Sequence, residues 1–178
     1  MAEVASTFNE QLLSRRLMER AKNDRERAFH INREIDSIRG TIIRQTMFAE
    51  FEKLIHASAE ANEPLTLDRL KEIYSGLLKL YFGPVFTLDD ELALECLRIP
   101  HFYRAFYVYK YDIALSERVL KVGERELNDY LGFLKGGCSQ FPLDLLRSAG
   151  VDMQQPEPVD TALEYFGRLV EELDTLLH

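Results

Sequence analysis

Two histidine–glutamate pairs are the first residues in this sequence whose spacing suits metal chemistry. His30 precedes Glu34, and His56 precedes Glu60, in each case by four positions. Side chains four positions apart lie on one face of an α-helix, so each pair could supply two metal ligands. A hydrogen bond between the two side chains on a solvated helix face is the simpler interpretation, and it is the one we prefer.

An aromatic segment at residues 101–111 (HFYRAFYVYKY) is harder to explain as ordinary core. On a helix, Tyr103, Tyr107 and Tyr111 form one stripe, whereas the phenylalanines and Tyr109 turn to another face. A buried phenol oxygen requires a hydrogen-bond partner, so a tyrosine stripe that begins at a histidine suits a polar cleft. Without further information, structural tyrosines in a core helix remain the preferred interpretation.

Several other kinds of chemistry lack the residues they need. The sequence has no serine in a nucleophile elbow, no glycine-rich phosphate loop and no Cys-X-X-Cys motif. Its two cysteines, Cys96 and Cys138, lie 42 positions apart without a nearby Cys or His pattern. Neither a disulfide framework nor a cysteine-based zinc site is therefore expected.

Composition limits the class of protein. The 178 residues are 46% hydrophobic and include 11 Phe and 8 Tyr, which is enough for a core and argues against disorder. The 22 basic residues against 30 acidic ones leave a net charge of −8, the opposite of a nucleic-acid binder. No apolar run approaches the roughly 18–20 residues that span a bilayer, and residues 1–5 do not resemble a secretory signal. We therefore expect a soluble cytoplasmic domain with no nucleic-acid or membrane partner.

Apolar residues recur at helical spacing along the chain, so we predict an all-α, multi-helix fold. The expected helices cover residues 3–39 (one interrupted helix or two), about 42–61, 66–82, a short segment from a capping box at 87–90 to 98, 101–122, 124–135, a short one after 142, and 160–177. Gly40 is expected to bend the chain, and Pro100 to open the long helix at 101–122. Pro156 and Pro158 are expected to form a linker before the last helix.

Several blocks of the sequence, in order, resemble the oligoendopeptidase F family. They are residues 2–10 (AEVASTFNE), 44–52 (RQTMFAEFE), 81–84 (YFGP), 98–103 (RIPHFY), 106–111 (FYVYKY), 133–137 (FLKGG) and 149–153 (AGVDM). The resemblance covers essentially residues 1–178. It implies a largely helical zinc metallopeptidase of the thimet-oligopeptidase type, which cleaves short peptides, with this chain as the C-terminal helical part of the catalytic domain.

The resemblance also implies roles for individual residues. The family binds zinc through a His-Glu-X-X-His helix and a later glutamate, and Glu3 matches that later ligand. Glu10 matches a second acidic position, either beside a ligand or structural. His101, Tyr103 and Tyr107 match the wall that contacts the substrate carbonyl and stabilises the oxyanion. Tyr107 is our first choice for the tyrosine that faces the metal, although spacing does not decide between the two.

The departures from the family pattern affect the expected activity. No His-Glu-X-X-His motif occurs, and residues 112–115 (DIAL) replace a run of small residues. Catalytic zinc normally has three protein ligands, and the glutamate of the motif is the general base. We therefore expect this chain alone to bind no zinc tightly and to be inactive.

The alternative is a helical binding or assembly module that retains the fold without the chemistry. It would bind peptides or complement a separate half. In either case, apolar surface that missing helices would cover favours a homo-oligomer.

Overall fold

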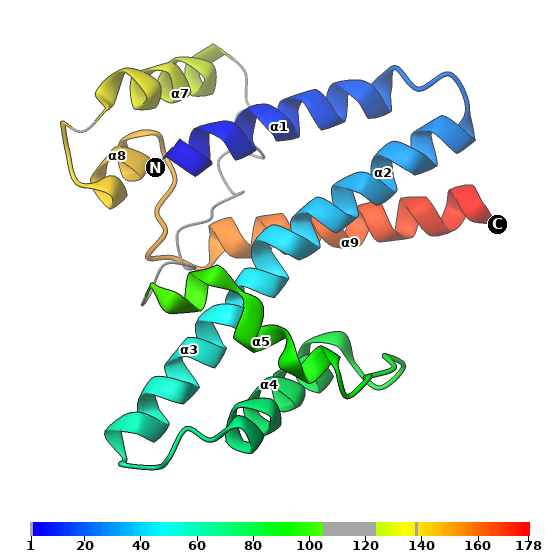
Figure 1. The fold of residues 1–178 in the computed structure, drawn as a ribbon. Helices are drawn as coiled ribbons and strands as arrows, with labels where there is room; N and C mark the ends of the chain where they lie inside the picture. The colour runs from blue at the N-terminus through cyan, green and yellow to red at the C-terminus, as the bar shows by residue number, and fades with distance from the viewer. Residues whose placement is uncertain (1, 105–123, 138) are drawn as a thin grey trace. The chain divides into compact units, whose positions relative to one another are not determined.

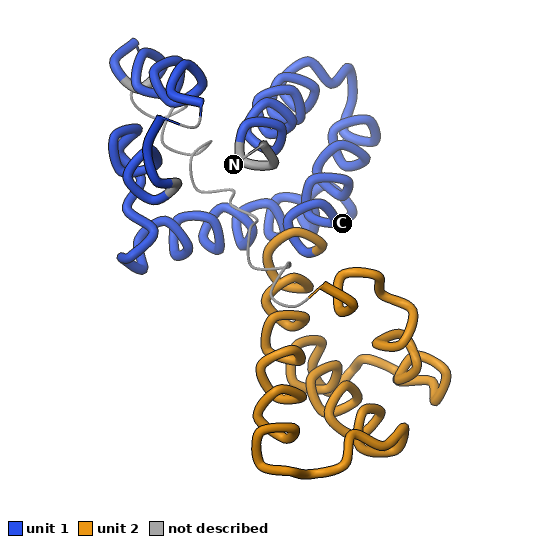
Figure 2. Tube along the Cα trace, turned by 60° about the vertical axis from the view of Figure 1, so that its left-hand side comes forward, with its two compact units in different colours: residues 1–39, 112–178 blue, residues 40–111 orange. Residues whose placement is uncertain are grey.

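The computed structural model describes residues 2–104, 124–137 and 139–178 (Figure 1). Within those ranges the chain forms helices, turns and loops without a strand, which confirms the all-α prediction. The chain divides into two compact units, coloured in Figure 2: unit 1 is Met1–Arg39 with Asp112–His178, and unit 2 is Gly40–Tyr111. Among the described helices, none combines the length and apolarity needed to cross a membrane.

Unit 1 is built on two long helices from the start of the chain and one from its end. Its described helices are α1 (Ala2–Glu19), α2 (Asp24–Ile38), α7 (Glu124–Gly136), α8 (Pro142–Ser148) and α9 (Glu157–Leu177). Helices α2 and α9 lie side by side, although their sequences are more than a hundred residues apart (Figure 1). An ion pair between Arg27 and Glu172 joins these two helices.

The interruption predicted within residues 3–39 is a short break between α1 and α2. Asn23 caps α2, its side-chain oxygen accepting a hydrogen bond from the Glu26 amide at 2.9 Å. The Glu26 carboxylate accepts in return from the Lys22 amide at 2.8 Å. Reciprocal bonds of this kind satisfy amides that a helix start leaves unpaired, so local sequence determines where α2 begins.

The hydrophobic core of unit 1 joins α1 to α7 and α8. Its buried members are Phe8, Tyr130, Phe133, Leu145, Leu146, Ala149 and Val151. The Tyr130 hydroxyl lies at the edge of this core and accepts a hydrogen bond of 3.1 Å from the Asn9 amide group. Helix α1, which carries Glu3 and Glu10, therefore packs against α7 and α8 through the face that contains Phe8.

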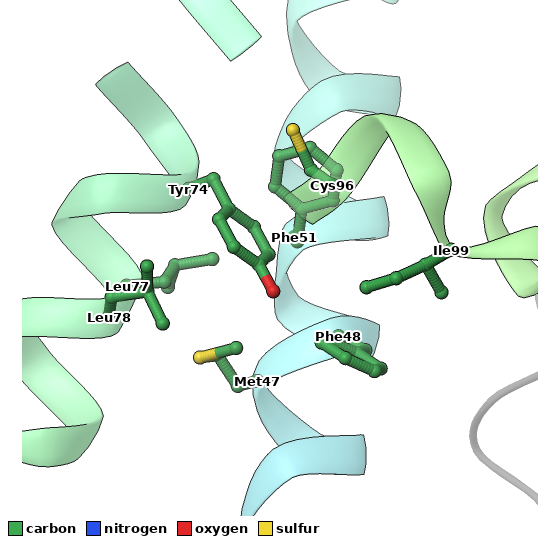
Figure 3. Close-up of a cluster of buried hydrophobic side chains, with 8 residues drawn as sticks. All are labelled: Met47, Phe48, Phe51, Tyr74, Leu77, Leu78, Cys96 and Ile99. Carbon is green, nitrogen blue, oxygen red and sulfur yellow. The ribbon is translucent and has the colours of Figure 1, made fainter. Parts of the chain in front are cut away.

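Unit 2 packs a helix pair against a chain of very short helical turns. Its described elements are α3 (Arg44–Glu60), α4 (Leu67–Phe82), η2 (Leu92–Leu94), α5 (Glu95–Arg98) and η3 (Pro100–Tyr103). The buried core is Met47, Phe48, Phe51, Tyr74, Leu77, Leu78, Cys96 and Ile99 (Figure 3). Thr66 caps α4 as its sequence predicts, and Gly83 ends that helix with a positive φ of 76°.

Gly40, where a bend is predicted, lies in a π-helical turn, η1 (Arg39–Ile43). Two other predictions are wrong. Pro158 belongs to the first turn of α9 rather than to a linker, because the first helical amides need no partner inside the helix. The expected capping box at residues 87–90 does not form, and the helical segment there begins at Leu92 without a side-chain cap.

The long helix expected over residues 101–122 is also wrong at its start. Pro100 occupies the first position of a helical turn, as predicted, but the turn is the short 3₁₀ segment η3. The backbone of Arg104 is extended, with φ −131° and ψ 94°, so η3 ends there. The rest of the expected helix, including Tyr107 and Tyr111, lies outside the described residues.

Candidate active-site turn at His101

The turn that carries His101 and Tyr103 is attached to unit 2 by apolar residues on either side of His101. Ile99 is buried in the unit 2 core, and Phe102 packs against it. The Phe102 ring lies 5.3 Å from Phe48 and 5.0 Å from Phe51, measured between centroids. A 3₁₀ turn places residues three positions apart on one side, so Ile99, which is buried, and Phe102, which is partly buried, both face the core.

His101 is half-buried and Tyr103 is 76% exposed. The Tyr103 hydroxyl donates a hydrogen bond of 2.7 Å to the backbone carbonyl of Leu97. A phenol has a single proton to donate, so in this arrangement Tyr103 has none left for another acceptor.

In α5, which precedes this turn in the chain, the carboxylate of Glu95 is buried and accepts hydrogen bonds from three donors. The Tyr74 hydroxyl donates to Oε2 at 2.7 Å. Arg44 pairs with Oε1, and the Arg98 guanidinium reaches the same oxygen at 3.1 Å. Charge-assisted hydrogen bonds to both oxygens offset the desolvation that burial of a carboxylate entails.

Burial raises the pKa of the Tyr74 phenol far above its ordinary value, and the hydrogen bond to Glu95 raises it further. Burial likewise raises the pKa of the Cys96 thiol, which argues against a reactive nucleophile. Tyr74 therefore stays protonated and serves Glu95 as a constant donor. Sequence reasoning missed this group, because its members come from three elements and form no local motif.

The predicted acidic residues belong to unit 1. Glu10 is exposed on α1 at the rim of a cavity of about 180 Å³ between α1 and α2. The side chain of Glu3 and all of Tyr107 lie outside the described parts of the chain. Glu10 therefore belongs to unit 1, whereas His101 and Tyr103 belong to unit 2.

The same cavity corrects the prediction for the His30–Glu34 pair. Glu34 is 3% exposed rather than solvated, and its Oε1 has no hydrogen-bond partner. Gln11, which is 2% exposed, also lines the cavity and leaves its Oε1 without a partner. No three histidine, cysteine or carboxylate side chains of the described residues gather to hold a metal ion.

The chain matches known proteins over almost its whole length. A family model described as Peptidase family M3 matches residues 1–165. The Oligopeptidase PepF of Bacillus subtilis is 45% identical over 99% of this chain. A plasmid-encoded Oligoendopeptidase F of Lactococcus lactis subsp. cremoris is 38% identical over 99% of this chain.

Solved structures agree in fold. The crystal structure of oligoendopeptidase-F from Enterococcus faecium matches 99% of this chain with a TM-score of 0.91 and 38% identity. A putative peptidase from Chlamydophila abortus matches 98% with a TM-score of 0.89, also at 38% identity. The chain spans 27% and 30% of the two curated relatives, and 36% and 30% of the two crystallised chains.

Proposed function

The chain belongs to peptidase family M3, and we propose that it is the C-terminal helical portion of a zinc metalloendopeptidase that hydrolyses short peptides. The observation that carries the proposal is the packing of the His101 turn against the unit 2 core. Ile99 and Phe102 are packed into or against the unit 2 core, and the side chains on either side of Phe102 are left accessible. We expect the place of action to be the cytoplasm.

Within this proposal His101 and a tyrosine act on the carbonyl of the scissile peptide bond. The imidazole and the phenol donate hydrogen bonds to the carbonyl oxygen, and these bonds strengthen as negative charge develops there. Tyr107 is the proposed phenol donor, because the proton of Tyr103 is already given to Leu97. Tyr103 then orients the turn, and it joins the wall only if that bond opens.

The metal of the proposed enzyme does not fit the described residues alone, since no three suitable side chains among them converge. Zinc in such an enzyme supplies Lewis-acid activation of water and of the carbonyl. We propose Glu3 as the contribution of this chain to its ligands, with Glu10 as a supporting carboxylate on the same helix. The other ligands and the general base belong to residues outside this sequence, which contains no His-Glu-X-X-His.

The test is cleavage of a mixture of quenched fluorescent peptides, with zinc and with or without a chelator. We expect no cleavage by the 178-residue chain. We expect chelator-sensitive cleavage by a hybrid enzyme, in which this chain replaces the matching segment of the Bacillus subtilis relative. Cleavage by the chain alone, or a folded hybrid without activity, would contradict the proposal.

The second candidate function is a helical binding or assembly module without chemistry. Large apolar side chains exposed in both units favour it, among them Val85 at 94% and Phe141 at 80%. A module of this kind would bind unlabelled short peptides while the hybrid enzyme stayed inactive. The same cleavage assay therefore separates the two candidates.

A further inference from the structure

We propose that Glu95, held by Arg44 and Tyr74, is a positioning residue that sets the orientation of the His101 turn. This inference rests on the proposed function, since it assigns a task to a residue of α5, the element that precedes the proposed oxyanion wall. Glu95 precedes His101 by six positions and does not itself belong to that wall. Its effect would pass through the backbone of α5 and η3.

The turn at residues 100–103 cannot hold its shape alone. Between Leu92 and Tyr103 the helical pieces are only 3, 4 and 4 residues long. Helices this short are unstable in isolation, so tertiary contacts must define them. The described N-terminal ends of these pieces have no side-chain cap that would compensate.

The orientation of the turn requires directional contacts in addition to apolar ones. The apolar contacts of Ile99 and Phe102 keep the turn against the core, but hydrophobic contacts tolerate rotation and sliding. Hydrogen bonds to both oxygens of one carboxylate do not, because each requires a particular distance and angle. Arg44 belongs to α3 and Tyr74 to α4, so these two bonds hold the Glu95 carboxylate in position relative to both helices.

Stability alone does not explain the hydrogen-bonded group around Glu95. A buried carboxylate with ionic partners is often no more stabilising than apolar residues of similar volume. Such groups are most useful where they specify one arrangement among several. The residue whose arrangement is at stake here is His101, on the turn that directly follows α5.

Unit 2 contains a matched control for the experiment. Tyr81 of α4 donates a 2.7 Å hydrogen bond to Glu50 of α3, the same length and chemistry as the bond from Tyr74 to Glu95. The Tyr81 bond makes no connection to residues 92–104. Tyr74→Phe and Tyr81→Phe therefore each delete one phenol–carboxylate bond, and only the first releases the turn.

The first measurement uses the 178-residue chain and needs no activity. We would record imidazole NMR signals and amide hydrogen exchange in the wild type, Tyr74→Phe, Glu95→Gln and Tyr81→Phe. In Tyr74→Phe and Glu95→Gln we expect the His101 signal to shift and the His56 signal to stay. Exchange of the amides of Phe102 and Arg104, which bond to carbonyls within the turn, should accelerate about tenfold.

Tyr81→Phe should leave both readouts at their wild-type values. If Tyr74→Phe and Tyr81→Phe lower stability equally and neither moves His101, then Glu95 is only a stabilising residue and the inference is wrong. If Glu95→Gln does not fold, the comparison of the two tyrosine variants still decides.

The second measurement is a double-mutant cycle on kcat and KM in the hybrid enzyme, combining Glu95→Gln with His101→Ala. We expect Glu95→Gln to lower kcat about tenfold and to leave KM nearly unchanged. In the His101→Ala background the same substitution should have little further effect on kcat. Additive losses would overturn the positioning role. No loss in His101→Ala alone would instead overturn the proposed function, so the two failures are distinguishable.

Discussion

Phe8 of α1 stacks on Tyr130 of α7, with ring centroids 3.7 Å apart and planes inclined by 29°. The two residues are separated by more than a hundred positions in the sequence, yet both belong to the unit 1 core. Phe8 sits on α1 between Glu3 and Glu10. The stack therefore holds the helix that carries both predicted acidic residues.

Replacement of Phe8 by alanine should lower the free energy of unfolding by about 3–5 kcal/mol, because it removes a buried ring and leaves a cavity. Chemical denaturation followed by circular dichroism measures the change. Phe29→Ala is the control, since the Phe29 ring is 64% exposed in the same unit, and its effect should stay within about 0.5 kcal/mol. Equal losses in the two variants would show that the stack does not stabilise unit 1.

Tyr103→Phe and Tyr107→Phe should differ in the hybrid enzyme. Loss of the proposed oxyanion donor Tyr107 should reduce kcat by roughly 10²–10³-fold. Loss of the Tyr103 hydroxyl removes only its bond to Leu97, so we expect a reduction of about tenfold or less. Steady-state kinetics on one peptide substrate measures both. The reverse order would make Tyr103 the donor and would require its bond to Leu97 to open.

Unit 2 should lose stability at high pH. Burial, followed by the hydrogen bond to Glu50, raises the pKa of Tyr81 to about 12, and burial raises the pKa of Tyr74 as well. Unfolded tyrosines ionise near pH 10. The stabilisation is therefore complete below pH 10 and is lost as the pH rises from about 10 through about 12.

Tyrosinate absorbance and denaturant unfolding across this pH range measure the effect. Tyr81→Phe should weaken the dependence of the unfolding free energy on pH between about 10 and about 12, because it removes the contribution of Tyr81. A wild-type chain in which every tyrosine titrates near pH 10 would contradict the assignment.

The isolated chain should associate with itself. Leu80 is 70% exposed, Val85 94% and Phe141 80%. Apolar surface favours association where it is contiguous. Light scattering across a wide concentration range should show a homodimer or larger species. A monomer at every concentration would count against self-association.

How far the sequence predicts the structure differs between elements of unit 2. The start of α4 at Thr66 and its end at Gly83 are predictable, because a hydroxyl cap and a positive φ depend on neighbouring residues only. Pro100 does begin a helical turn, as predicted. The turn is a short 3₁₀ segment, however, and not the start of the predicted long helix. Proline at the first position is compatible with either an α-helix or a 3₁₀ turn. The contacts of the Phe102 ring with Phe48 and Phe51 of α3 are consistent with the short turn.

By itself the sequence determined the all-α class and the ends of the helices that carry local caps, because caps and periodicity act within a few residues. It also indicated the family, through blocks of residues that resemble known members. Tertiary structure alone decided which carboxylates are buried. Glu34 and Glu95 have nothing in their immediate sequence that separates them from the exposed Glu10 and Glu60. Burial of a charge depends on where distant donors such as Tyr74 and Arg44 arrive, and that is settled only when the helices pack.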